Sequence, residues 1–114
     1  MNDPSERREN PRIEVEWPIT LYCDDELIEG VSRNITAGGI YVCCDKPLPM
    51  DKVFRISIAP PNHQAIAVTG QIVWSDLYGL GDDEDMFGVG VCLIEMSDED
   101  RHCLNELVLL SLKL

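Results

Sequence analysis

The chain has 114 residues, of which 45% are hydrophobic and 26% are charged. This length allows one domain with a single core, and the composition is typical of a globular protein and too apolar for a disordered one. Nine Lys and Arg residues against 21 Asp and Glu residues give a net charge of −12, which disfavours binding to the phosphate backbone of DNA or RNA.

Alternation of apolar and polar residues predicts a chain made mostly of short strands. Residues 1–12 are polar and contain two prolines, so we expect an exposed arm there. The first strand is predicted over residues 13–23, where every second residue is apolar and Pro18 on the outward face suggests an edge or a bulge. Five more strands are predicted at 27–33, 40–44, 54–58, 66–74 and 87–93, with a long acidic loop at 75–85.

The C-terminal segment carries the signals of a helix. Ser97 is the predicted N-cap and acidic residues follow it in the first turn, while leucines recur at helical spacing up to Leu112. Six short strands in a flat sheet would leave two open edges, and closure into a barrel removes them. The predicted fold is therefore dominated by β-structure: a small six-stranded antiparallel β-barrel with one C-terminal α-helix. Within a single domain over 1–114, the arm takes residues 1–12, the barrel 13–96 and the helix 97–114.

Residues that could support catalysis or bind a metal are sparse. No glycine-rich phosphate loop is present, and the two histidines lie near no cysteine at ligand spacing. The five cysteines include no CxxC pair, so we interpret them as buried thiols rather than ligands or disulfides. The acidic run at 82–85 lacks the alternation of a calcium loop. The sequence therefore predicts no catalytic site, no metal site and no enzyme.

Targeting signals are also missing from the pattern. The longest apolar runs have about four residues, whereas a membrane-spanning helix needs about 20. The N-terminal arginines are followed by no apolar stretch of the kind found in signal peptides. We expect a cytoplasmic protein with no membrane span.

Two short polar motifs stand out from this background. Arg8 and Arg12 lie four positions apart on the arm, with Arg7 directly before them, and guanidinium groups can grip phosphates, pair with guanine and stack on bases. Asn34-x-Thr36-x-x-Gly39 lies between two predicted strands and offers short polar side chains beside glycines. Taken separately, the first is typical of a solvated tail and the second of a well-braced turn.

Together, the two motifs resemble the PilZ domain family, whose pattern is RxxxR followed by [D/N]xSxxG. The resemblance covers nearly the whole chain, including the fifth-strand segment Gly70–Trp74, the sixth-strand segment Phe87–Val91 and the helix after it. It implies a bacterial receptor for cyclic di-GMP that is not an enzyme. In that family the arm arginines fold over the ligand and the polar turn meets it from the barrel side.

The resemblance implies ligand-binding roles for specific residues. On the arm these are Arg8 and Arg12, and on the turn Asn34, Thr36 and Gly39. Asn34 is the less common option at its position and removes a negative charge beside the ligand phosphates. Thr36 in place of serine keeps the hydroxyl but adds a methyl group, so we expect modest weakening at most from that change. Arg7 belongs to the predicted site as well, because family members with arginine there tend to bind an intercalated dimer; we predict two ligand molecules per chain and no other cofactor.

The expected mechanism is signalling by shape, in which ordering of the arm creates a surface for an unidentified effector protein. The alternative is an adaptor of the same family that binds no nucleotide. A small-barrel oligonucleotide binder is a weaker candidate, since it would need a basic groove with interleaved aromatics, and we expect most of the seven aromatic residues to face the core. The chain is expected to be a monomer or weak dimer.

Overall fold

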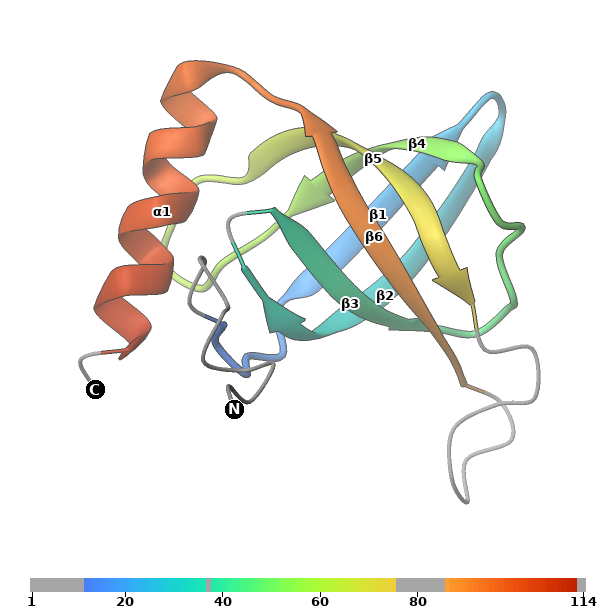
Figure 1. The fold of residues 1–114 in the computed structure, drawn as a ribbon, viewed down its shortest axis with the longest axis horizontal. Helices are drawn as coiled ribbons and strands as arrows, with labels where there is room; N and C mark the ends of the chain where they lie inside the picture. The colour runs from blue at the N-terminus through green and yellow to red at the C-terminus, as the bar shows by residue number, and fades with distance from the viewer. Residues whose placement is uncertain (1–11, 37, 76–85, 113–114) are drawn as a thin grey trace, which may run out of the picture.

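The computed structural model describes residues 12–36, 38–75 and 86–112. Within these ranges six antiparallel strands close into a barrel in the order β1-β2-β3-β6-β5-β4, and one helix lies across one end of it (Figure 1). The elements are β1 (Pro18–Cys23), β2 (Glu26–Ile35), β3 (Gly39–Cys44), β4 (Val53–Ile58), β5 (Ile66–Ser75), β6 (Phe87–Glu95) and α1 (Asp98–Leu112). The predicted fold class is confirmed.

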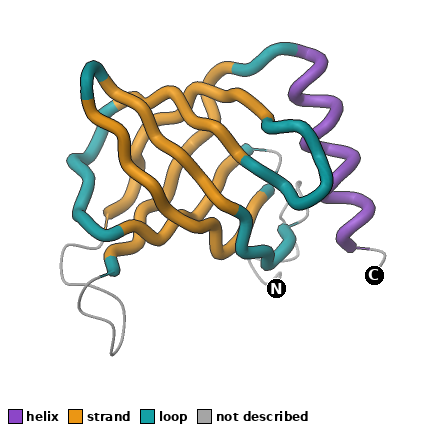
Figure 2. The backbone as a smooth tube through the Cα atoms, turned by 180° about the vertical axis from the view of Figure 1, so that it is seen from behind, coloured by secondary structure: helices purple, strands orange, loops and turns teal. Residues whose placement is uncertain are grey.

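The barrel interior is filled by the inward-facing apolar residues of all six strands, among them Leu21, Phe54 and Ile72, which are at most 1% exposed. Helix α1 adds Leu104 and Val108 to the same core and so covers the open end, as the view from behind also shows (Figure 2). This burial, rather than helix propensity, holds the helix in place. Among the described residues, no helix has the length and apolar content that a membrane crossing requires.

The predicted N-cap of α1 is confirmed by its hydrogen bonds. The Asp100 backbone N–H donates to Ser97 Oγ at 3.0 Å, and the Arg101 N–H donates to the Ser97 carbonyl at 2.9 Å. Ser97 thereby satisfies an amide that would otherwise lack a partner in the first turn.

The prediction of one continuous strand over residues 13–23 is wrong, because β1 begins only at Pro18. A proline is tolerated at the first position of a strand, where its missing N–H costs no ladder hydrogen bond. The residues before it still follow β2: Ile13 pairs with Ile35, and Pro18 pairs with Val31. Pro18 lies five residues after Ile13, whereas their partners Val31 and Ile35 are only four residues apart. The segment before β1 therefore contains one extra residue, which forms a bulge and interrupts the ladder.

The expectation that most aromatic side chains face the core is also wrong for the described residues. Trp17 and Phe54 are buried, but Tyr22 is 43% and Trp74 is 46% exposed. The register between β5 and β6 shifts between Ile72 and Trp74, so the strict alternation that placed Trp74 inside does not hold there. A bulge of this kind turns every later side chain of the strand to the other face.

All five cysteines are free, but they are not uniformly buried as predicted. Cys43 and Cys44 are buried, Cys23 and Cys103 are half-buried, and Cys92 is exposed. Burial raises the pKa of the Cys44 thiol above its ordinary value, since a thiolate would lose its hydration there. Cys92 is therefore the most accessible thiol of the protein.

Candidate functional site

The turn between β2 and β3 is held together by the hydroxyl of Thr36. Its Oγ1 accepts hydrogen bonds from the backbone N–H groups of Gly38 at 3.0 Å and of Gly39 at 2.9 Å. The Thr36 N–H in turn donates to the Gly39 carbonyl at 2.9 Å. The strands also run further than predicted, since Asn34 lies within β2, which ends at Ile35, and Gly39 begins β3. The turn proper is consequently short and is braced by these hydrogen bonds.

Gly39 is required by a close approach between strands. A Cβ atom added there would lie 3.0 Å from the carbonyl oxygen of Val91, a backbone atom of β6 that has little freedom to move. Gly39 pairs with Cys92 in this ladder. A side chain at this position would push the turn away from β6, so the glycine of the motif keeps the turn flush with the barrel wall.

The structure brings the end of the arm to this turn. Ile13 and Ile35 exchange two backbone hydrogen bonds of 2.9 Å each, and both side chains are buried. In an antiparallel pair, the residue before Ile13 lies opposite the residue after Ile35, so Arg12 lies next to Thr36. Arg12 is exposed. Arg12 thus lies beside a turn more than 20 positions away in the chain, while Arg7 and Arg8 lie outside the described residues.

Ser32 anchors the segment that leads to Arg12. Its side chain is fully buried, and its Oγ donates to the Val15 carbonyl at 2.5 Å and accepts from the Trp17 N–H at 2.9 Å. The Ser32 N–H also donates to the Trp17 carbonyl at 2.9 Å. The hydroxyl therefore replaces the ladder bonds that the bulge in this segment removes, and it fixes the path of the chain toward the turn.

Asn34 begins a row of outward-facing neighbours that crosses three more strands. It pairs with Tyr41 on β3, Tyr41 pairs with Gly90 on β6, and Gly90 pairs with Trp74 on β5. Gly90 has no side chain, so the rings of Tyr41 and Trp74 meet above it with centroids 5.5 Å apart and planes tilted by 33°. The half-exposed Asn34 amide thus lies beside a two-ring aromatic surface, the Tyr41–Trp74 platform.

This platform was missed by sequence reasoning, because strict alternation placed Trp74 in the core. An exposed aromatic ring can stack on a planar base, and each such contact contributes about 1–3 kcal/mol. The signal that was available is the glycine at position 90, which leaves room on the outer face of a strand between two aromatic residues.

A further cation near the turn was also missed. Arg33 is the extra residue at a second bulge, between the pairs of Ser32 with Val42 and Asn34 with Tyr41. Its Nε donates to Cys43 Sγ at 3.2 Å, and this hydrogen bond raises the pKa of the Arg33 guanidinium above its ordinary value. Arg33 is otherwise exposed, so it adds a permanent positive charge beside Asn34.

The arrangement suits an anionic ligand that carries flat rings. Arg12 and Arg33 supply guanidinium groups, Asn34 an amide that both donates and accepts, and the Tyr41–Trp74 platform a stacking surface. Within the described ranges, no three acidic, cysteine or histidine side chains converge in a way that could hold a metal ion.

Comparison with solved structures shows the same fold in several proteins. MotI/DgrA of Bacillus subtilis, an inhibitor of motility, is 18% identical with a TM-score of 0.78; the match covers 99% of this chain but only 57% of that one. The PilZ domain of YcgR from Escherichia coli, solved with c-di-GMP, is 12% identical with a TM-score of 0.76 over 94% of this chain and 92% of that one. The MrkH–c-di-GMP complex of K. pneumonia is 16% identical with a TM-score of 0.79, covering 94% and 53% of the two chains.

These likenesses are below 25% identity and establish the fold alone. A search of curated protein sequences found no match. A family model is more specific, because the PilZ domain model matches residues 6–110, which include both polar motifs and all six strands. The chain belongs to the PilZ domain family.

Proposed function

We propose that this protein is a receptor for cyclic di-GMP in the bacterial cytoplasm and that it has no enzymatic activity. Its membership of the PilZ domain family supports this, as do two neighbours of the same fold, YcgR and MrkH, that were solved with c-di-GMP. The protein then responds to the ligand by a change of shape that a partner protein reads.

The observation that carries the proposal is the pair of hydrogen bonds between Ile13 and Ile35, which places Arg12 beside the Asn34–Gly39 turn. Cyclic di-GMP offers two phosphates and two guanine bases. An arginine can pair with a phosphate or with the O6/N7 edge of guanine, and the Asn34 amide can bind a base edge. The Tyr41–Trp74 platform would stack a base from the barrel side, an interaction that needs no further movement of the chain.

The remaining arm residues complete this proposal. Arg7 and Arg8, outside the described residues, close over the ligand from the solvent side, and Arg7 holds a second ligand molecule. Fixing a residue costs about 1–2 kcal/mol of backbone entropy, so the contacts made by the arm must exceed that cost. The surface formed by the closed arm is the proposed signal to the effector protein.

The alternative function is that of an adaptor that works through protein contacts and binds no nucleotide. One observation favours it: the Thr36 hydroxyl already accepts two hydrogen bonds within the turn, a role that requires no ligand. The motif would then be retained for the stability of the turn alone.

Isothermal titration of cyclic di-GMP separates the two functions. The wild type should bind with a stoichiometry near two, and Arg12→Ala should weaken binding at least about tenfold, because a hydrogen bond to a charged group contributes about 1.5–3 kcal/mol. Arg101→Ala, which removes an exposed arginine on α1, is the matched control and should bind as the wild type does. Arg7→Ala should lower the stoichiometry to one.

Fluorescence of the exposed Trp74 provides a second readout, since a base stacked on its ring should quench it. Absence of heat and of quenching at millimolar ligand would contradict the receptor and favour the adaptor. An equal loss of affinity for cyclic di-GMP in Arg12→Ala and Arg101→Ala would show that Arg12 acts only through its general positive charge and not through a contact in a specific site.

A further inference from the structure

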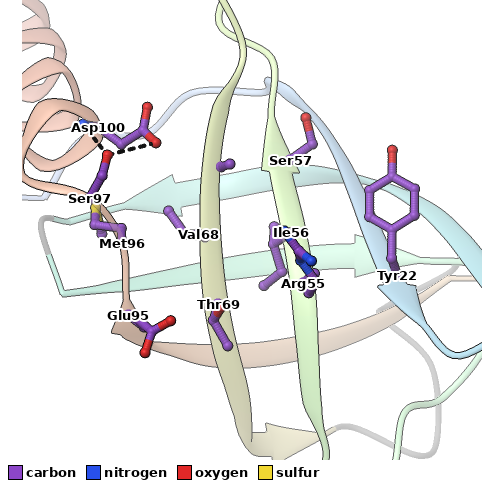
Figure 3. A pocket seen from close by; sticks show the side chains of 11 residues that line it. Tyr22, Arg55, Ile56, Ser57, Val68, Thr69, Glu95, Met96, Ser97 and Asp100 are labelled. Carbon is purple, nitrogen blue, oxygen red and sulfur yellow. Dashed lines mark hydrogen bonds between the residues drawn. The ribbon is translucent and has the colours of Figure 1, made fainter.

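A groove lies on the outer wall of the barrel where β1, β4 and β5 meet the start of α1. Its volume is about 480 Å³, and its walls include Tyr22 and Arg55 on one side and Glu95 and Asp100 on the other, with Thr69 between them (Figure 3). None of these residues belongs to the cyclic di-GMP site proposed above. We call this feature the Arg55–Glu95 groove.

The register of the barrel explains how this groove is assembled. Leu27 pairs with Tyr22, Tyr22 with Arg55, Arg55 with Thr69, and Thr69 with Glu95, so five outward-facing residues form one row across five strands. Directly opposite residues on neighbouring strands have side chains close enough to present one continuous surface. The pairing of the strands therefore fixes which side chains line this surface.

The two ends of the groove carry opposite charges that do not neutralise one another. Arg55 and Glu95 are separated by two strand spacings, about 10 Å. Within the part of the chain that the structure describes, neither takes part in an ion pair. Asp100 accepts a hydrogen bond from Ser97 Oγ at Oδ2 only, so its Oδ1 has no hydrogen-bond partner among the described residues. Both charged ends are available to a ligand.

Apolar surface extends the groove beyond Arg55. Leu27 is 55% and Tyr22 is 43% exposed, and they are cross-strand neighbours. At the other end Met96 joins the wall beside Glu95. An occupant that combines apolar and charged groups along an extended shape would match both kinds of surface, whereas a free nucleotide would bring its phosphates against Glu95 and Asp100.

We propose that the Arg55–Glu95 groove binds an extended, basic segment of a partner protein. A lysine or arginine side chain lies between Glu95 and Asp100, an apolar side chain of the segment covers Tyr22 and Leu27, and the guanidinium of Arg55 donates to backbone carbonyls between them. The distance of about 10 Å between the charged ends corresponds to roughly three residues of extended chain. The net charge of −12 draws a basic partner toward the molecule and repels a second copy of this chain.

The groove and the proposed nucleotide site share no residue, although both reach β5 and β6. On β5, Trp74 of the platform lies five residues beyond Thr69 of the groove, and on β6, Glu95 of the groove lies three residues beyond Cys92, the partner of Gly39. The partner segment and cyclic di-GMP therefore contact different side chains. The groove binds its segment whether or not the nucleotide proposal holds.

The test uses an array of acetylated hexapeptide pools, in which one position is fixed as Arg, Lys, Glu, Leu or Gly and the others are random, probed with the labelled full chain. Pools with a fixed Arg or Lys should retain the most protein. The best peptide is then titrated into ¹⁵N-labelled protein, and amide shifts should concentrate on Tyr22, Arg55, Thr69 and Glu95. Glu95→Gln should weaken binding about threefold or more, the effect of losing one ion pair at a surface.

Glu106→Gln is the matched control, since it neutralises an exposed carboxylate on α1 whose neighbour is His102 and not the groove. It should bind the peptide as the wild type does. The proposal is overturned if basic pools are not preferred, if Glu95→Gln and Glu106→Gln weaken binding equally, or if the shifts fall elsewhere. If cyclic di-GMP itself shifts the groove amides, the groove holds a nucleotide and the proposal is overturned. If sedimentation shows a dimer that Tyr22→Ser dissociates, the groove holds a second copy of the chain, which overturns the proposal as well.

Discussion

Replacing Ser32 by alanine removes the side chain that ties the residues leading to Arg12 onto the barrel. In the wild type the Ser32 hydroxyl donates to the Val15 carbonyl and accepts from the Trp17 N–H, and it is fully buried. Alanine fills nearly the same volume but offers neither bond. The change therefore leaves the half-buried Val15 carbonyl and the buried Trp17 N–H without this partner, with little effect on packing.

The cost follows from those two orphaned groups. Leaving one buried polar group unsatisfied costs about 1–3 kcal/mol, and the half-buried Val15 carbonyl costs less because water can reach it, so we expect a loss of about 2–4 kcal/mol in the free energy of unfolding. For a domain of this size that corresponds to a fall in Tm of roughly 10 °C. Because the loss is local to the segment, the amide of Trp17 should also exchange with solvent faster than amides of the barrel core.

Ser75→Ala is the matched control. The Ser75 hydroxyl is buried and finds no hydrogen-bond partner in the described part of the chain, so its removal should change stability by less than about 0.5 kcal/mol. Urea unfolding of both variants, followed by circular dichroism, gives the two free energies, and hydrogen exchange locates the change. Equal stability of Ser32→Ala and Ser75→Ala would refute the argument that the Ser32 hydrogen bonds fix the path of the chain.

Three further predictions concern other parts of the barrel. Gly70→Ala should destabilise the fold by about 1–3 kcal/mol in urea unfolding, because the new Cβ would lie within 3 Å of two core side chains; unchanged stability would contradict this close packing. At pH 8, Cys44 should react with iodoacetamide at least roughly a hundredfold more slowly than the exposed Cys92, because burial raises the pKa of the Cys44 thiol. Mass spectrometry of the labelled peptides measures both rates, and equal rates would contradict this prediction. The hydrogen bond from Lys46 lowers the pKa of Glu26, so the contribution of this pair to stability is fully present above the ordinary pKa of a glutamate, about 4.3, and is lost as the pH falls through the lowered value. The difference in Tm between wild type and Glu26→Gln should therefore shrink on acidification below about pH 4.3, and a difference that grows would contradict the sign.

Much of the barrel was predictable from the sequence because the signals for a strand are local. Apolar residues at every second position bury one face of each strand, and Ser97 before three acidic residues marks a helix start. The two polar motifs could likewise be recognised from residue type and spacing, and with them the family. The sequence alone does not show where Arg12, Asn34, Thr36 and Gly39 lie relative to one another.

Those positions were decided by tertiary structure, because they depend on register between segments far apart in the chain. The pairing of Ile13 with Ile35 brings Arg12 to the turn, and one bulge turns Trp74 from the predicted core to the surface. The Arg55–Glu95 groove depends likewise on the alignment of five strands. A bulge shifts the facing of every residue after it, and only the partner strand determines where it occurs; for that reason the sequence determined the elements, and the closed barrel decided which side chains meet on its surface.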